Sequence, residues 1–203
     1  MLRRDRGKKL LIGVTGGVGA GKSLACKYFA GLGCEVFYAD SIAKQLYITN
    51  KSLKSSLVSE FGSNILENKS VSLARLRVLV FNNSKNQKRV NRIVHPFVFK
   101  EFAKFVKEST SKILIHEAAL IFESGFNKKL DYIINISANK RLRIQRVRKR
   151  SSLPLSVIMK IMSMQLTEKE RNEKSDFIIK NNGTPLQLKK QVKLMTGILK
   201  SLR

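Results

Sequence analysis

The sequence predicts an α/β fold in which helices flank a parallel sheet. Short apolar runs alternate with helical patterns along the chain, which is the order of βαβ units. The first run, residues 10–15, stops at glycines, as a buried parallel strand does. The helical stretch between the second and third runs is too long for a simple crossover, so it predicts an inserted helical subdomain.

Each element of the sheet domain has a local signal. A helix from Ser23 to Ala30 ends at glycines, and a strongly basic helix is expected at 139–150. Pro154 suits the first turn of the next helix, and Thr184 with Pro185 is a good start for a C-terminal helix. Strands are expected at 10–15, 35–38, 112–117, 131–137 and 176–180.

The inserted subdomain, residues 41–111, is predicted to be helical throughout. Asn, Ser and Gly residues predict breaks at 62–64 and 82–86. We expect the pair His95-Pro96 to close a turn before a last helix at 97–107.

Composition restricts the class of protein. The chain has 203 residues, 43% of them apolar, which suits one compact domain with an insertion. Its formal net charge of +26 is typical of proteins with anionic partners. No apolar run approaches the roughly 18 residues of a membrane span, and the basic start at Met1 does not lead into a signal peptide. Cys26 and Cys34 predict neither a disulfide framework nor a metal site, so we expect a cytoplasmic protein.

Residues 16–23 match the phosphate-binding pattern G-x-x-x-x-G-K-[ST] between a predicted strand and a predicted helix. Glycines let backbone N–H groups turn inward around phosphates, and the helix start adds its positive dipole end. Lys22 is expected to reach the β- and γ-phosphates, and the Ser23 hydroxyl to bind Mg²⁺. The motif indicates a P-loop NTPase fold but not the acceptor. We assign nucleotide binding to Gly16, Gly17, Val18, Gly19, Ala20, Gly21, Lys22, Ser23 and Leu24.

Asp40 follows the second predicted strand, so it should lie at the carboxyl edge of the sheet, where ligands gather. A carboxylate there can orient or accept the proton of an attacking hydroxyl, or help to hold Mg²⁺. An Asp before a helix is more often an N-cap, and spacing alone favours the cap.

An ordered set of short motifs accompanies the phosphate loop. The members are Leu32-Gly33, Val36 to Ala43 with Asp40, Phe61-Gly62, Ile93 to Pro96, Leu120 to Glu123, Leu130-Asp131, Arg146, Arg150, Gln165, Ser175-Asp176 and Asn181. Together they resemble the dephospho-coenzyme A kinase family over essentially the whole chain. The resemblance implies phosphorylation of the ribose 3′-hydroxyl of dephospho-coenzyme A, with ATP and Mg²⁺ as cofactors.

The resemblance also implies domain roles. Residues 1–40 and 112–203 would form the nucleotide-binding core, 41–111 the acceptor subdomain, and 139–165 a helical lid. Between 140 and 150 the chain has seven basic residues and no acid, which otherwise indicates a solvated basic face.

Individual roles follow from the same resemblance. The catalytic residues would be Lys22, Asp40 and Arg146, with Asp40 orienting or deprotonating the hydroxyl. ATP would also contact Arg150 and Asn181. The acceptor would contact Asp40, Arg75, His95 and Glu117, although Glu117 equally suits a capping role and a lone His is more often structural.

Four positions depart from the family pattern. Tyr38 stands where the family usually has an Asp, Leu24 replaces a common Thr, and Ala119 replaces a Pro. Leu73 stands where the family has an arginine that faces the substrate, and Arg75 is a possible substitute.

Two other functions remain open on the residues alone. A P-loop kinase of another small molecule would also suit Asp40 and the phosphate loop. A nucleic-acid-binding P-loop protein would suit the net charge, but the dispersed basic residues make such binding incidental. The oligomeric state is not predicted.

Overall fold

The computed structural model describes residues 9–81 and 83–202, so the basic start at Met1 lies outside the described residues. The chain forms two compact units. The first unit is built from residues up to Phe37 and from Val106 onward, and the second is Tyr38–Phe105. The predicted insertion, 41–111, covers most of the second unit but begins and ends later in the chain.

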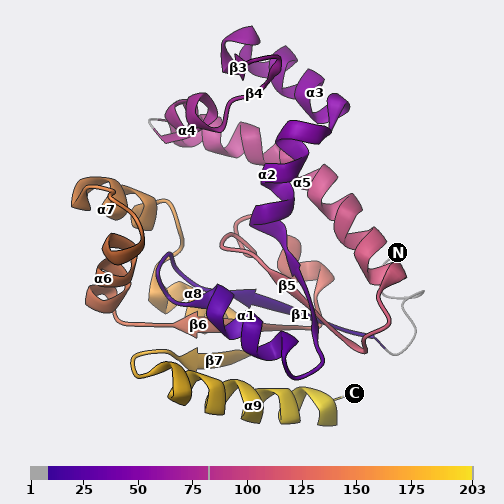
Figure 1. Cartoon of the computed structure of the whole chain (residues 1–203), viewed down its shortest axis with the longest axis vertical. Coiled ribbons are helices and arrows are strands. Elements are labelled where there is room, and N and C mark those ends of the chain that lie inside the picture. Colours follow the sequence, from indigo (N-terminus) through magenta and orange to yellow (C-terminus); the bar gives the residue numbers. More distant parts are fainter. Residues whose placement is uncertain (1–8, 82, 203) are drawn as a thin grey trace. The chain divides into compact units, whose positions relative to one another are not determined.

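The first unit contains a five-stranded sheet with the order β2-β5-β1-β6-β7 (Figure 1). The pairs β1–β5, β1–β6 and β6–β7 are parallel, which confirms the α/β prediction. All six residues of β1 are buried, as its short apolar run predicts. The strands are β1 (Leu10–Thr15), β2 (Glu35–Tyr38), β5 (Ile113–Glu117), β6 (Tyr132–Ser137) and β7 (Phe177–Lys180).

Three of the predicted strands begin one residue later than expected, and an aspartate directly precedes two of them, β6 and β7. Asp131 accepts a hydrogen bond from the N–H of Leu11 at 2.8 Å, and Asp176 accepts one from the N–H of Ile133 at 2.7 Å. Each carboxylate therefore pairs with the end of the neighbouring strand in place of a backbone carbonyl.

Helices pack around this sheet, with α1 against α9 and α8 against β6. The predicted start of the C-terminal helix is confirmed, since Thr184 caps it and Pro185 is its first residue. A capping box between Thr167 and Glu170 begins a further helix that the sequence did not predict. The helices are α1 (Lys22–Ala30), α6 (Lys140–Arg150), α7 (Leu155–Ser163), α8 (Glu168–Lys174) and α9 (Pro185–Ser201), with a 3-10 turn, η2, at Phe126–Lys129.

The second unit is mostly helical, but the prediction of helices throughout is wrong at its centre. Asn68 and Lys69 have φ angles of 50° and 63°, which make a two-residue hairpin between β3 and β4. Asparagine tolerates this left-handed region better than most residues. The elements are α2 (Ala39–Thr49), α3 (Lys51–Phe61), η1 (Ser63–Ile65), β3 (Leu66–Glu67), β4 (Ser70–Val71), α4 (Leu73–Phe81) and α5 (Ser84–Glu108).

The predicted turn at His95-Pro96 is also wrong, because α5 continues through Pro96. Proline removes one backbone hydrogen bond from a helix interior. The buried side chains Val90, Val94 and Val98 are spaced four apart on both sides of the proline. Packing of this stripe outweighs the lost bond. Within the described part of the chain, no helix has the length and apolar character to cross a membrane.

Candidate active site

Parallel pairing places the carboxyl ends of β1, β5, β6 and β7 at one edge of the sheet. The phosphate loop follows β1, Glu117 ends β5, and α6 begins just after β6. Asn181 directly follows β7. The first unit therefore brings residues 16–24, Glu117 and Asn181 to one edge, together with the start of the basic helix.

The phosphate loop needs glycine where it meets the first helix. Gly21, the N-cap of α1, has φ 99°, a left-handed conformation that favours glycine. A Cβ at Gly21 would collide with the side-chain amide of Asn181. Gly21 has no side chain, so it places no side-chain oxygen at the start of α1. The positive end of the α1 dipole therefore faces the phosphate loop without such a cap from Gly21.

The ammonium group of Lys22 lies across this loop. Its Nζ donates to the carbonyl oxygen of Gly16 at 3.1 Å and is 3.9 Å from Oε1 of Glu117. The side chains of Lys22 and Glu117 are only 11% and 7% exposed. A buried ammonium opposite a buried carboxylate stays in place, because each charge is costly to leave unpaired.

A magnesium ion fits this edge of the sheet only with help from phosphates. Ser23, in the first turn of α1, has an exposed side chain. The described residues contain no group of three or more His, Cys, Asp and Glu side chains that could hold a metal. Mg²⁺ commonly takes one or two protein oxygens and completes its shell with phosphates and water. The Ser23 hydroxyl is an oxygen donor of this kind.

Arg146 and Asn181 are fixed to each other and to the phosphate loop. Arg146 donates through Nη2 to the backbone carbonyl of Asn181 at 2.9 Å, and the Asn181 amide donates to the carbonyl of Ala20 at 2.8 Å. Nη1 of Arg146 is buried and has no acceptor among the described residues. A buried N–H without a partner is costly, so this nitrogen is suited to an acceptor atom of a ligand. Arg150 is exposed at the end of α6.

Sequence reasoning missed two side chains that hold the phosphate loop. The N–H of Val18 donates to Oε1 of Gln165 at 2.9 Å, and its carbonyl accepts from Nε of Arg143 at 3.0 Å. In the sequence, Gln165 is only one of the family motifs, and Arg143 is only one of the seven basic residues between 140 and 150. Their spacing in the sequence contains no sign of contact with Val18, because the fold alone joins these segments.

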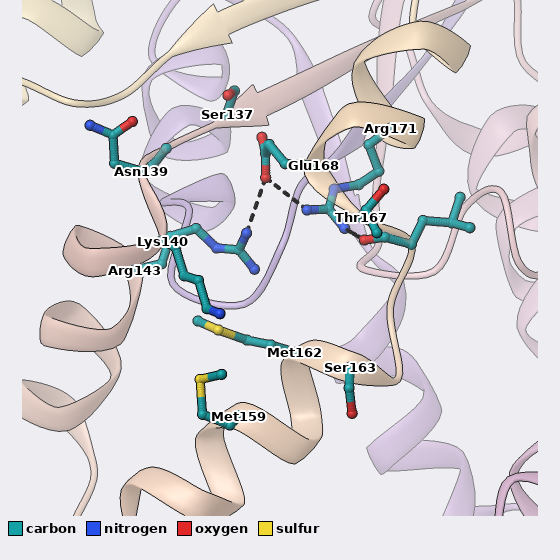
Figure 2. A pocket seen from close by; sticks show the side chains of 12 residues that line it. Ser137, Asn139, Lys140, Arg143, Met159, Met162, Ser163, Thr167, Glu168 and Arg171 are labelled. Atoms are coloured by element: carbon teal, nitrogen blue, oxygen red, sulfur yellow. Dashed lines mark hydrogen bonds and ion pairs between the residues drawn. The ribbon is translucent and has the colours of Figure 1, made fainter.

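A pocket of about 450 Å³ lies beside Arg143, among the helices α6, α7 and α8. In Figure 2, Met159 and Met162 of α7 lie on the opposite side of the pocket from Glu168 and Arg171 of α8. The carboxylate of Glu168 lies between the guanidinium groups of Arg143 and Arg171. The residues on these two sides of the pocket, on α7 and α8, come from the part of the chain that follows β6.

The remaining predicted site residues lie in the second unit. Asp40 is exposed in the first turn of α2, whose N-cap is Tyr38, so the N-cap interpretation of Asp40 is wrong. Arg75 donates through Nη1 to the backbone carbonyls of Asn64 and Leu66, which fastens the β3–β4 hairpin.

His95 is half-buried in α5. Its ring stacks on Phe99 with 5.7 Å between ring centroids. Burial lowers the pKa of His95, because the charged imidazolium loses solvation. The imidazole is therefore neutral at neutral pH. His116, at the end of β5, packs against the rings of Phe37 and Phe126, as a structural histidine does.

Comparison of the sequence with known proteins identifies a family for this chain. The family model for dephospho-CoA kinase matches residues 10–187. Two curated proteins described as dephospho-CoA kinase are similar over most of their length. The protein from Gamma-proteobacterium EBAC31A08 is 37% identical over 187 residues, covering 92% of this chain and 95% of the relative. The protein from Fusobacterium nucleatum is 34% identical over 184 residues, covering 90% and 95%.

The fold agrees with a solved structure. The dephospho-CoA kinase from Campylobacter jejuni aligns with a TM-score of 0.65 and 27% sequence identity, covering 95% of this chain and 98% of that one. The parallel sheet with flanking helices is therefore that of a P-loop kinase.

Proposed function

Because this chain belongs to the dephospho-CoA kinase family, we propose that its first unit holds ATP and its second unit holds the acceptor. The chain transfers a phosphoryl group from ATP to dephospho-CoA, the last step of coenzyme A biosynthesis. The observation that carries the first assignment is the start of α1 beside the Lys22 ammonium. A helix start and a fixed cation both attract a triphosphate.

Lys22 neutralises the β- and γ-phosphates as a point charge. Its contacts with Gly16 and Glu117 hold the ammonium at the loop, so little side-chain entropy is lost when ATP binds. Mg²⁺, when bound to the phosphates and the Ser23 hydroxyl, supplies further positive charge against the negative charge of the transferred group.

Asp40 acts on the acceptor. Its exposed carboxylate on the first turn of α2 accepts the proton of the ribose 3′-hydroxyl as that oxygen attacks phosphorus. The carboxylate takes the hydroxyl proton late, because that proton becomes acidic only as the new P–O bond forms.

Arg146 and Arg150 act from the lid segment, residues 139–165. Arg146 offers its buried Nη1 to ATP, and Arg150 adds a positive charge from the exposed end of α6. Both stabilise negative charge on the phosphates. Arg75, His95 and Glu117 stay predicted acceptor contacts, and the guanidinium of Arg75 would have to share its present hydrogen bonds with the substrate.

The test measures ADP release by the purified protein with Mg²⁺ and ATP. Dephospho-CoA, adenosine, AMP and CMP are supplied as alternative acceptors. We expect stimulation by dephospho-CoA alone, with coenzyme A as the product. Equal stimulation by AMP or CMP would contradict an acceptor unit that selects dephospho-CoA.

A further inference from the structure

The peptide groups of Val18 in the phosphate loop are held by two segments distant in sequence. Gln165, between α7 and α8, accepts from the N–H of Val18 at 2.9 Å. Arg143, on α6, donates through Nε to its carbonyl oxygen at 3.0 Å. The conformation of the loop at Val18 therefore depends on where these two segments lie.

Arg143 and Gln165 are connected to each other through two charged side chains of α8. Glu168 accepts from Nη1 of Arg143 at 3.0 Å and from Nη2 of Arg171 at 2.8 Å (Figure 2). Arg171 also donates through Nη1 to the backbone carbonyl of Leu166, which directly follows Gln165. The contacts close a ring, here called the Val18 ring, made of Val18, Arg143, Glu168, Arg171, Leu166 and Gln165.

The ring depends on one carboxylate. Arg143 and Arg171 are 6% and 2% exposed, so both cations are nearly removed from water. Burial lowers the pKa of Arg143, and Glu168 opposes that shift. Without Glu168, two buried guanidinium groups would face each other with no counter-charge, which is strongly unfavourable.

A second carboxylate steadies the same segment from outside the ring. Oε1 of Glu123 accepts a hydrogen bond from the N–H of Leu166 at 3.0 Å. The segment that carries Gln165 is thus held through both the N–H and the carbonyl of Leu166. Displacement of α8 would therefore be transmitted to Gln165 and from there to Val18.

We propose that Glu168 is a positioning residue for ATP. It holds Arg143 against the Val18 carbonyl and Arg171 against the segment of Gln165, and so keeps the phosphate loop in the form that receives the triphosphate. This inference rests on the proposed assignment of ATP to the loop. Since the ring contacts the phosphate loop and no residue proposed for the acceptor, its loss affects ATP and leaves dephospho-CoA binding unchanged.

The main test is Glu168→Gln, measured by calorimetric titration with Mg²⁺-ATP and by steady-state kinetics at saturating ATP. A neutral amide cannot balance two guanidinium groups. We expect the Kd for ATP to rise about tenfold, the effect of 1.4 kcal/mol. The KM for dephospho-CoA and kcat at saturating ATP are expected to stay within about twofold, since a positioning residue touches neither acceptor nor reacting atoms.

The matched control is Glu173→Gln, the same change on the same helix. Glu173 pairs with Lys169 at the surface, at 3.9 Å, and takes no part in the ring. Its variant should bind ATP like the wild type. If Glu173→Gln raised the Kd for ATP as much as Glu168→Gln does, the inference would be overturned. A general loss of negative charge on α8 would then explain both increases.

Arg143→Lys is the second variant, and it tests the inference if Glu168→Gln does not fold. Lysine keeps a charge for Glu168 but cannot donate to two acceptors through a planar fork. We expect a similar rise in the Kd for ATP, and no further rise in the double variant, because both changes break the same ring. Glu168→Asp, which retains the carboxylate, should recover part of the affinity.

Two results would overturn the inference. One is folded Arg143→Lys and Glu168→Gln proteins with wild-type affinity for ATP. The other is an equal loss of affinity for both substrates. Lys22→Ala, measured in the same titration, distinguishes failure of this inference about Glu168 from failure of the proposed function. If Lys22→Ala also binds ATP normally, the assignment of ATP to the loop is wrong.

Discussion

The two units of the molecule hold their polar side chains in different ways. In the first unit, Lys22 and Asn181 are buried or nearly so and bonded to backbone atoms of the phosphate loop. In the second unit, Asp40 is exposed, and Arg75 is engaged by the hairpin of its own unit. The fold therefore holds the side chains of the proposed nucleotide site in place before ATP binds. The proposed acceptor unit instead offers an exposed carboxylate.

The difference has a thermodynamic consequence. A substitution at a buried, bonded group of the first unit changes both stability and ATP binding, because the same contacts serve both. A substitution at Asp40 changes the reaction with little effect on stability, because exposed groups contribute little to folding. The two regions can therefore be separated by measuring activity and unfolding in the same variants.

Lys22→Ala should lower the activity most. Loss of the ammonium removes the point charge on the β- and γ-phosphates, and turnover should fall by at least about 10³-fold. Circular dichroism should show a folded protein. Turnover near the wild-type rate would contradict the role of the loop.

Asp40→Asn is expected to lower kcat by about 10²–10⁴-fold, the usual contribution of an acid–base group. The Kd for ATP and the melting temperature should stay near wild-type values, since the side chain is exposed in the second unit. Normal turnover would show that Asp40 takes no part in proton transfer.

Arg146→Ala and Arg150→Ala compare a buried and an exposed arginine on the same helix. Removing Arg146 takes a buried donor from the Asn181 carbonyl, so unfolding should become easier by about 1–3 kcal/mol and ATP binding weaker. Arg150→Ala removes an exposed side chain and should leave the melting temperature unchanged while lowering kcat. Equal stability losses would contradict the buried role of Arg146.

The smallest expected effect concerns His95 and pH. Burial lowers its pKa in the folded state, so the unfolded state takes up the proton first as pH falls below about 6.5, the ordinary value for histidine. The contribution of the neutral ring to stability is present above that pH and is lost below it. His95→Asn should therefore lose less stability than the wild type between pH 7.5 and 5.5 in urea unfolding. If His95→Asn and the wild type lost the same stability over this pH range, the result would contradict a buried, neutral His95 ring in the folded protein.

The amino-acid pattern alone was enough to predict the parts of the fold that depend on neighbouring residues. Three features depend on only a few consecutive residues each: the apolar run of β1, the phosphate loop from Gly16 to Ser23, and the Thr184-Pro185 helix start. Backbone conformation and helix capping act at this range, so these elements and the loop of the site followed from the pattern.

The parts that depend on distant contacts could be seen only in the folded chain. The passage of α5 through Pro96 follows from packing of a buried stripe, against the local preference of proline. Arg143, Glu168 and Arg171 are three of many charged residues in the sequence, and only folding buries two of them around the third. Side-chain partners far apart in sequence have no local signal, because burial and hydrogen-bond geometry exist only once the sheet and its helices have assembled.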